Sequence, residues 1–106
     1  MIEEEQKLRQ GIMDSYLVIL LEQEHLNQRK TCVEKGERVT LGDLGLAHQQ
    51  RDYLNELYGS LHEYNANYKN NSMISLEQHR KKDLQDIENL ILHWRELYSK
   101  QLERCA

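Results

Sequence analysis

The spacing of apolar residues constrains the fold most strongly, because they recur at steps of three and four along nearly the whole chain. In the last third of the sequence the series is Leu84, Ile87, Ile91, Trp94, Tyr98, Leu102 and Cys105. Such spacing places side chains on one face of an α-helix, whereas a half-buried strand would need strict alternation. The 106 residues include no proline and only five glycines, which argues against a turn-rich β-sandwich or barrel. The sequence therefore predicts an all-α protein.

Two short interruptions divide this pattern into three predicted helices, over residues 2–35, 40–69 and 75–104. The first interruption begins at Gly36, which suits the left-handed conformation that often ends a helix. Because both loops are short, neighbouring helices are expected to run antiparallel. We therefore predict a single helical domain over residues 1–106, folded as an elongated antiparallel three-helix bundle. The alternative is a helical hairpin with coiled-coil-like packing, in which the third helix packs on another molecule.

Local capping signals support these boundaries. Thr40 and Asp43 have the spacing of an acidic capping box at the start of the second helix. Ser75 begins a second capping box, which predicts the start of the third helix. Asn70 or Asn71 is expected to end the second helix in the left-handed conformation.

The apolar seams also predict the core. Residues that repeat at helical spacing on the second and third helices should face each other across the bundle. The positions expected to be most buried are Leu54, Leu57, Leu61, Ile87, Ile91 and Trp94.

Motifs for catalysis and metal binding are missing from the sequence. Glu22 and His25 form one Glu-x-x-His motif, whereas a di-metal carboxylate bundle needs two such motifs and two further glutamates. Cys32 and Cys105 are far apart and lack a local Cys–His signature. The sequence contains neither a phosphate-binding glycine motif nor a nucleophile elbow. We therefore predict a non-enzymatic protein with no catalytic residue, no cofactor and no metal.

One basic cluster occurs in a chain whose net charge is −4. Arg80, Lys81 and Lys82 follow one another near the start of the third predicted helix. They form either a solvated helix face or a contact for an acidic partner or a phosphate backbone. The acidic chain lacks the broad basic surface that dominates nucleic-acid affinity, so nucleic-acid binding is not expected.

The sequence also bears on the cellular compartment. Its longest apolar run is six residues, far short of the 20 or so that span a membrane, so membrane insertion is not expected. The acidic first residues do not resemble a secretory signal or a transit peptide. Two cysteines form no disulfide framework, and we expect a reducing compartment, the cytoplasm.

That apolar run lies in the middle of the first predicted helix, over residues 16–21. At about 100° per residue, six consecutive positions sweep more than a full turn. At least two of the four residues Leu17, Val18, Leu20 and Leu21 must therefore point away from any single core. Polar residues flank the run on both sides, as in an interface with a polar rim. The partner-binding residues predicted here are Tyr16, Leu17, Val18, Leu20 and Leu21.

The aromatic composition is unusual, with six tyrosines, one tryptophan and no phenylalanine. Tyrosine buries its ring while its hydroxyl stays wet, and it is enriched at protein–protein interfaces. Four tyrosines of the second helix either form the half-buried rim of an ordinary core or line a groove for a partner. They are Tyr53, Tyr58, Tyr64 and Tyr68.

These patterns favour a protein–protein interaction module, such as an adaptor, an export or assembly chaperone, or a small helical subunit. It would form a homodimer or bind a protein partner. In shape and pattern, the long leucine-rich first helix, short loop and second helix resemble small helical secretion or flagellar export chaperones. A coiled-coil subunit of a larger assembly fits the same pattern. The alternative function is a nucleic-acid-associated or phage-type regulatory protein that uses the basic start of the third helix.

Overall fold

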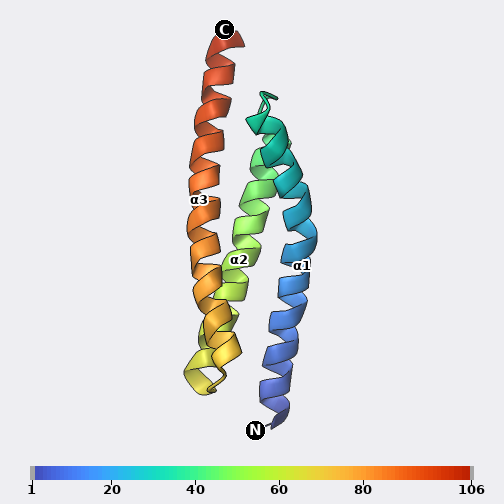
Figure 1. Cartoon of the computed structure of the whole chain (residues 1–106), viewed down its shortest axis with the longest axis vertical. Helices are drawn as coiled ribbons and strands as arrows, with labels where there is room; N and C mark the ends of the chain where they lie inside the picture. The colour runs from blue at the N-terminus through green and yellow to red at the C-terminus, as the bar shows by residue number, and fades with distance from the viewer. Residues whose placement is uncertain (1, 106) are drawn as a thin grey trace.

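Three long helices form an elongated bundle measuring 61 × 20 × 19 Å. The computed structural model describes residues 2–105, and the side chain of Cys105 lies outside the described part. The helices are α1 (Ile2–Glu34), α2 (Leu41–Asn67) and α3 (Asn71–Cys105), and residues 2–105 contain no strand. They run up, down and up, so sequential neighbours are antiparallel while α1 and α3 run in the same direction (Figure 1). The predicted all-α architecture is confirmed.

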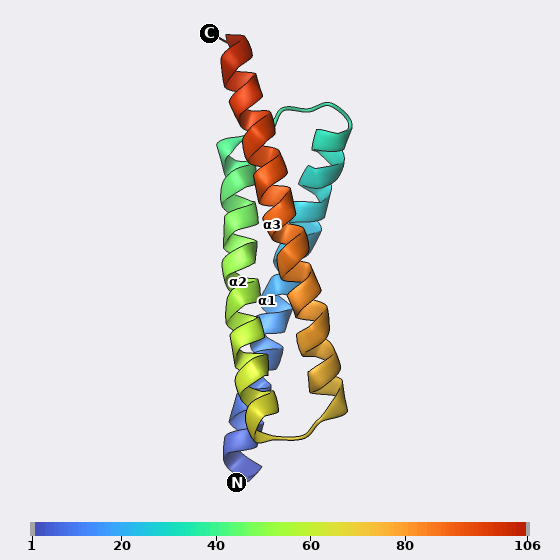
Figure 2. The same cartoon turned by 90° about the vertical axis from the view of Figure 1, so that its left-hand side faces the viewer.

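The helix α2 is the centre of the packing. Both α1 and α3 pack directly against it, whereas no Cα of α1 lies within 8 Å of a Cα of α3. Figure 1 shows α2 between the other two helices, and Figure 2 shows α3 passing in front of α1. The third helix therefore packs on α2 of its own chain, and the side of the bundle between α1 and α3 stays more open.

The core follows the predicted seams. All six positions expected to be most buried are at most 6% exposed. On α1 the buried residues are Ile12, Ile19 and Leu26, spaced seven apart. This spacing keeps one narrow face of α1 against α2 along most of its length.

The seam of α3 is exposed near its end. Leu102, predicted to continue the seam, is exposed. The last turns of α3 extend past the loop that joins α1 and α2, so this part of the helix has little to pack against (Figures 1 and 2). The next seam position, Cys105, lies outside the described side chains.

The start of α2 agrees with its capping signal. The Asp43 amide donates a hydrogen bond to Thr40 Oγ1 at 3.0 Å, and the Thr40 amide donates to Asp43 Oδ2 at 3.0 Å. These reciprocal bonds form the predicted capping box. Gly36 has φ +103°, the left-handed conformation expected after the first helix.

The start of α3 does not agree with its capping signal. The helix begins at Asn71, and Ser75 lies within it rather than at its cap. Asn70 acts as the cap instead, because its Oδ1 accepts hydrogen bonds from the amides of Ser72 and Met73 at 3.0 and 3.3 Å. The earlier start places the Met73 side chain on the helix, where it packs into the core. The helix therefore starts at the Asn70 cap and not at Ser75, because the Asn70 start also buries the side chain of Met73.

The end of α2 also differs from the prediction. Tyr68 forms the C-cap in an extended conformation, with φ −133° and ψ 152°. Apart from glycine, no residue within the described range has a positive φ, so neither Asn70 nor Asn71 ends the helix in the left-handed region.

We expect Asn70→Ala to lower the free energy of unfolding by about 1 kcal/mol, because two amides at the start of α3 lose their acceptor. Ser75→Ala should change it by less than about 0.5 kcal/mol, the usual range for an exposed site without such a role. Urea denaturation followed by circular dichroism measures both variants. Equal losses in the two variants would show that Asn70 is not the cap.

Candidate protein-interaction surface

Five apolar side chains of α1 are exposed close together. We call them the α1 patch, and their exposed fractions range from 41% to 78%. The residues of the α1 patch are Met13, Leu17, Val18, Leu20 and Leu21.

Helical geometry explains why these side chains stay outside. Ile19, in the middle of the run, is buried against α2. At 100° per residue, Leu17 and Leu21 lie roughly 160° away from it on the helix surface. The geometric prediction for the run is confirmed, since all four of Leu17, Val18, Leu20 and Leu21 are exposed. Whether a partner binds them stays a prediction.

The α1 patch reaches two shallow hollows on its flanks. Val18 lines one with Asp14 and Ser15 of α1 and with Tyr53 and Glu56 of α2. The patch therefore continues onto α2 through the half-buried ring of Tyr53. On the other flank, a hollow toward the α1–α3 side is lined by Leu20, Gln23, Glu24, Asn27, Gln28 and Thr31.

The four tyrosines predicted to line a partner groove have different surroundings, and Tyr64 is fully buried, which corrects the hypothesis for that residue. Tyr53 lies beside the α1 patch, whereas Tyr58 is half-buried and stacks on His62 with ring centroids 6.3 Å apart. Tyr64 is fully buried in the core, and Tyr68 packs beside it with ring centroids 5.1 Å apart. Only Tyr53 is therefore available to extend the α1 patch.

Tyr64 belongs to the core because it continues the seam of Leu57 and Leu61. Its hydroxyl donates a 2.6 Å hydrogen bond to Glu5 Oε1, which gives the polar tip of a buried ring a partner. The hydrogen bond to the Glu5 carboxylate raises the pKa of Tyr64. This contact fastens the first turns of α1 to the end of α2.

In the basic cluster on α3, Arg80 contacts neighbouring side chains, whereas the two lysines are exposed. The Arg80 guanidinium carbon lies 5.1 Å from the ring centroid of Tyr16, an arrangement that favours a cation–π interaction. The Nε of Arg80 is 2.9 Å from Asp83 Oδ2, but its N–H is not directed at an acceptor, so the contact is an ion pair. Lys81 and Lys82 are exposed. Arg80 and Tyr16 thus bridge α3 and α1, and neither is free for a partner in this conformation.

A narrow groove lies between α1 and α3, on the side of that bridge toward the C-terminal end of α1. It holds about 130 Å³ and is lined by Ile19, Gln23, Leu26, Asn27, Lys30, Gln50, Leu54, Asp83, Asp86, Ile87 and Leu90. Pockets for small organic ligands are typically 300–1,000 Å³. The groove therefore has room for about one side chain.

Gln50 is the buried polar residue in the wall of this groove. Its Nε2 donates to the Ile19 carbonyl at 3.1 Å, and its Oε1 has no hydrogen-bond partner. The carbonyl can only accept, so rotating the amide would not give both atoms a partner.

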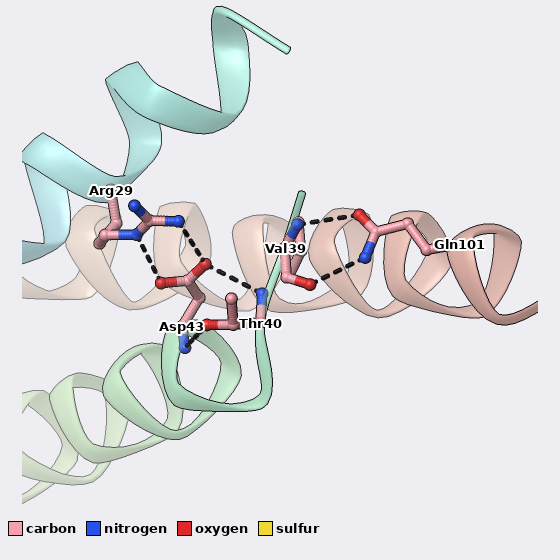
Figure 3. A network of polar contacts seen from close by, with 5 residues as sticks. All are labelled: Arg29, Val39, Thr40, Asp43 and Gln101. Atoms are coloured by element: carbon pink, nitrogen blue, oxygen red, sulfur yellow. Dashed lines mark hydrogen bonds and ion pairs between the residues drawn. The ribbon is translucent and has the colours of Figure 1, made fainter. Parts of the chain in front are cut away.

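Near the C-terminal end of α1, a polar network closes the loop between α1 and α2 (Figure 3). Arg29 donates to both carboxylate oxygens of Asp43, at 2.7 and 3.0 Å. Gln101 of α3 pairs with the backbone of Val39 through two 2.8 Å hydrogen bonds. Together with Thr40, these side chains join all three helices at one point.

The network sets the charge state of Asp43. Its side chain is only 5% exposed, which by itself would disfavour the carboxylate. The hydrogen bond from Arg29 outweighs this effect, with a smaller contribution from the Thr40 amide, and lowers the pKa of Asp43. The pair stays ionised at neutral pH and stabilises the loop.

Other predicted chemistry can be placed in the structure. Within residues 2–105, no three His, Cys, Asp or Glu side chains converge as they would to hold a metal ion. The Cys32 thiol is unpaired, and its pKa is raised chiefly by a hydrogen bond with Glu37 and by burial. A raised pKa is the opposite of what activates a nucleophilic thiolate.

None of the helices in the described part is both long and apolar enough to cross a membrane.

Comparison with protein-family models, with curated proteins and with solved structures found no match to this chain.

Proposed function

We propose that this chain is a non-enzymatic protein–protein interaction module that acts through the α1 patch. An adaptor, an export or assembly chaperone, and a small subunit of a complex all belong to this class. The observation that carries the proposal is the cluster of five exposed apolar side chains on one helix.

Energetics support an association role for this cluster. Burying one fully exposed leucine side chain is favourable by roughly 1.5–3 kcal/mol. A partner that covered several residues of the α1 patch would therefore gain binding free energy. Large exposed apolar patches on monomeric proteins are often functional, especially when a polar rim surrounds them. Asp14 and Glu24 supply such a rim on α1.

The basic cluster offers weaker support for nucleic-acid binding. Arg80 is held by Tyr16 and Asp83, which leaves Lys81 and Lys82 in a chain of net charge −4. Two exposed lysines fall short of the basic surface that supplies most nucleic-acid affinity.

For the compartment we propose the cytoplasm, because a chain with two cysteines has no disulfide framework and suits a reducing environment.

The test compares the double variant Leu17→Gln, Leu21→Gln with a matched control, Leu92→Gln. Leu92 is 62% exposed on α3, so its replacement removes an equally accessible leucine outside the patch. We expect self-association or binding of a co-purified protein to weaken by about tenfold or more in the double variant only. Light scattering and quantitative co-purification measure these effects, and circular dichroism checks that both variants remain helical. Unchanged association in a folded double variant would exclude the α1 patch as the interface.

A further inference from the structure

We propose that the partner of the α1 patch is a basic amphipathic helix, whose apolar stripe is bordered by lysine or arginine. This inference rests on the proposed function, because it names the class of partner for the same surface. The charges that surround the patch carry the inference.

The rim of the α1 patch is acidic. Within one helical turn of the patch, α1 carries three carboxylates, Asp14, Glu22 and Glu24, and one guanidinium, Arg9. On α2, Glu56 adds a fourth carboxylate, because it lines the same hollow as Val18 and Asp14. Glu24 lines the other hollow with Leu20. Carboxylates therefore border the apolar surface along both flanks.

Hydrogen bonding leaves these charges available. Asp14 accepts one 2.8 Å hydrogen bond from Gln10, a neutral donor, so its negative charge is not neutralised. Asp14, Glu24 and Glu56 are all exposed. A cationic side chain can approach each of them from solvent and strengthen binding through charge-assisted hydrogen bonds.

A second copy of the chain fits this rim poorly. Two α1 helices packed antiparallel about Ile19 would place Leu17 against Leu21, which suits the apolar centre. The same register places Asp14 of each copy opposite Glu24 of the other, so carboxylates would meet at both ends of the contact. Like charges juxtaposed across an interface oppose association. Anionic lipids and nucleic-acid phosphates would meet the same repulsion.

The spacing of the acids defines what the partner must present. Asp14 and Glu24 are ten residues apart, or about 15 Å along the helix axis. The patch itself runs from Met13 to Leu21, about two helical turns, which suits a helix with anchors at i, i+3 or i+4, and i+7. A partner helix lying along α1 therefore needs basic residues about ten positions apart, on either side of such a stripe.

Two synthetic helical peptides of about 20 residues provide the test. They share one leucine stripe and differ only in carrying lysine or glutamate at the two flanking positions. Fluorescence anisotropy measures their binding to the full chain at low salt and at about 0.5 M salt. We expect the lysine peptide to bind about tenfold more tightly at low salt, and the difference to shrink at high salt. In the variant Asp14→Asn, Glu24→Gln, Glu56→Gln the preference should fall below about threefold, while Leu92→Gln should leave it unchanged.

The outcomes separate this inference from the function on which it rests. Equal binding of the two peptides, or binding of neither, would overturn the basic-helix partner. If the wild type forms a dimer in light scattering that Leu17→Gln, Leu21→Gln abolishes, a second copy is the occupant and the inference fails while the proposed function stands. Tighter binding to phosphatidylserine vesicles than to the lysine peptide would also overturn it.

Discussion

Replacing Leu61 with alanine is expected to lower the free energy of unfolding by about 3 kcal/mol, within the usual range for a buried leucine. Leu61 has no exposed surface, and it lies on α2, the helix against which both others pack. Removing three carbon atoms there leaves a cavity that long, straight helices can only partly close. For a domain of about 100 residues, such a loss lowers the melting temperature by more than about 10 °C.

Leu92→Ala is the matched control for that measurement. It removes the same atoms from a leucine on α3 that is mostly exposed, so we expect a change below about 0.5 kcal/mol. Urea denaturation followed by circular dichroism gives both values. A loss below about 1 kcal/mol for Leu61→Ala would place the seam of α2 on a different face.

Replacing Asp43 with alanine is expected to cost about 3 kcal/mol, since it breaks a largely buried ion pair and removes half of a capping box. Arg29 would lose both of its carboxylate contacts, and the Thr40 amide would lose its acceptor. The loop that joins α1 and α2 would keep its two hydrogen bonds with Gln101.

The same carboxylate makes stability depend on pH. The folded state holds the pKa of Asp43 below its ordinary value of 3.8, chiefly through Arg29. A lowered pKa means that the stabilisation is fully present above about pH 4 and is lost as the pH falls through the folded value. The stability difference between wild type and Asp43→Asn should therefore be constant from pH 5 to 7 and should shrink in acid, where the wild-type side chain also becomes neutral. A difference that stays the same down to about pH 2 would contradict this account.

Features that depend only on residues close together in the chain were predictable before the structure. Apolar spacing fixed the three helices and the buried seam through Leu57, Leu61 and Ile91. The Thr40–Asp43 capping box was predictable because both residues lie within one helical turn. Helix geometry alone predicted that at least two of Leu17, Val18, Leu20 and Leu21 point away from the core, because six consecutive positions sweep more than a full turn.

The contacts that join separate helices depend on how the helices pack. Arg29 is fourteen residues from Asp43, and Gln101 is sixty-two from Val39, so no local sequence pattern predicts either contact. Competition between caps was also decided by packing, because starting α3 at Asn71 places Met73 in the core.

The candidate site also has a part that was predictable from the sequence and a part that depends on packing. The apolar centre of the α1 patch lies on one helix, whereas Glu56 and Tyr53 reach it from α2. Arg80 is not available together with Lys81 and Lys82, because the packing of the bundle places the Tyr16 ring beside its guanidinium. Residue spacing along one helix determines which side chains share a face. Which face meets another helix, and which charges surround it, depends on how the helices pack across the bundle.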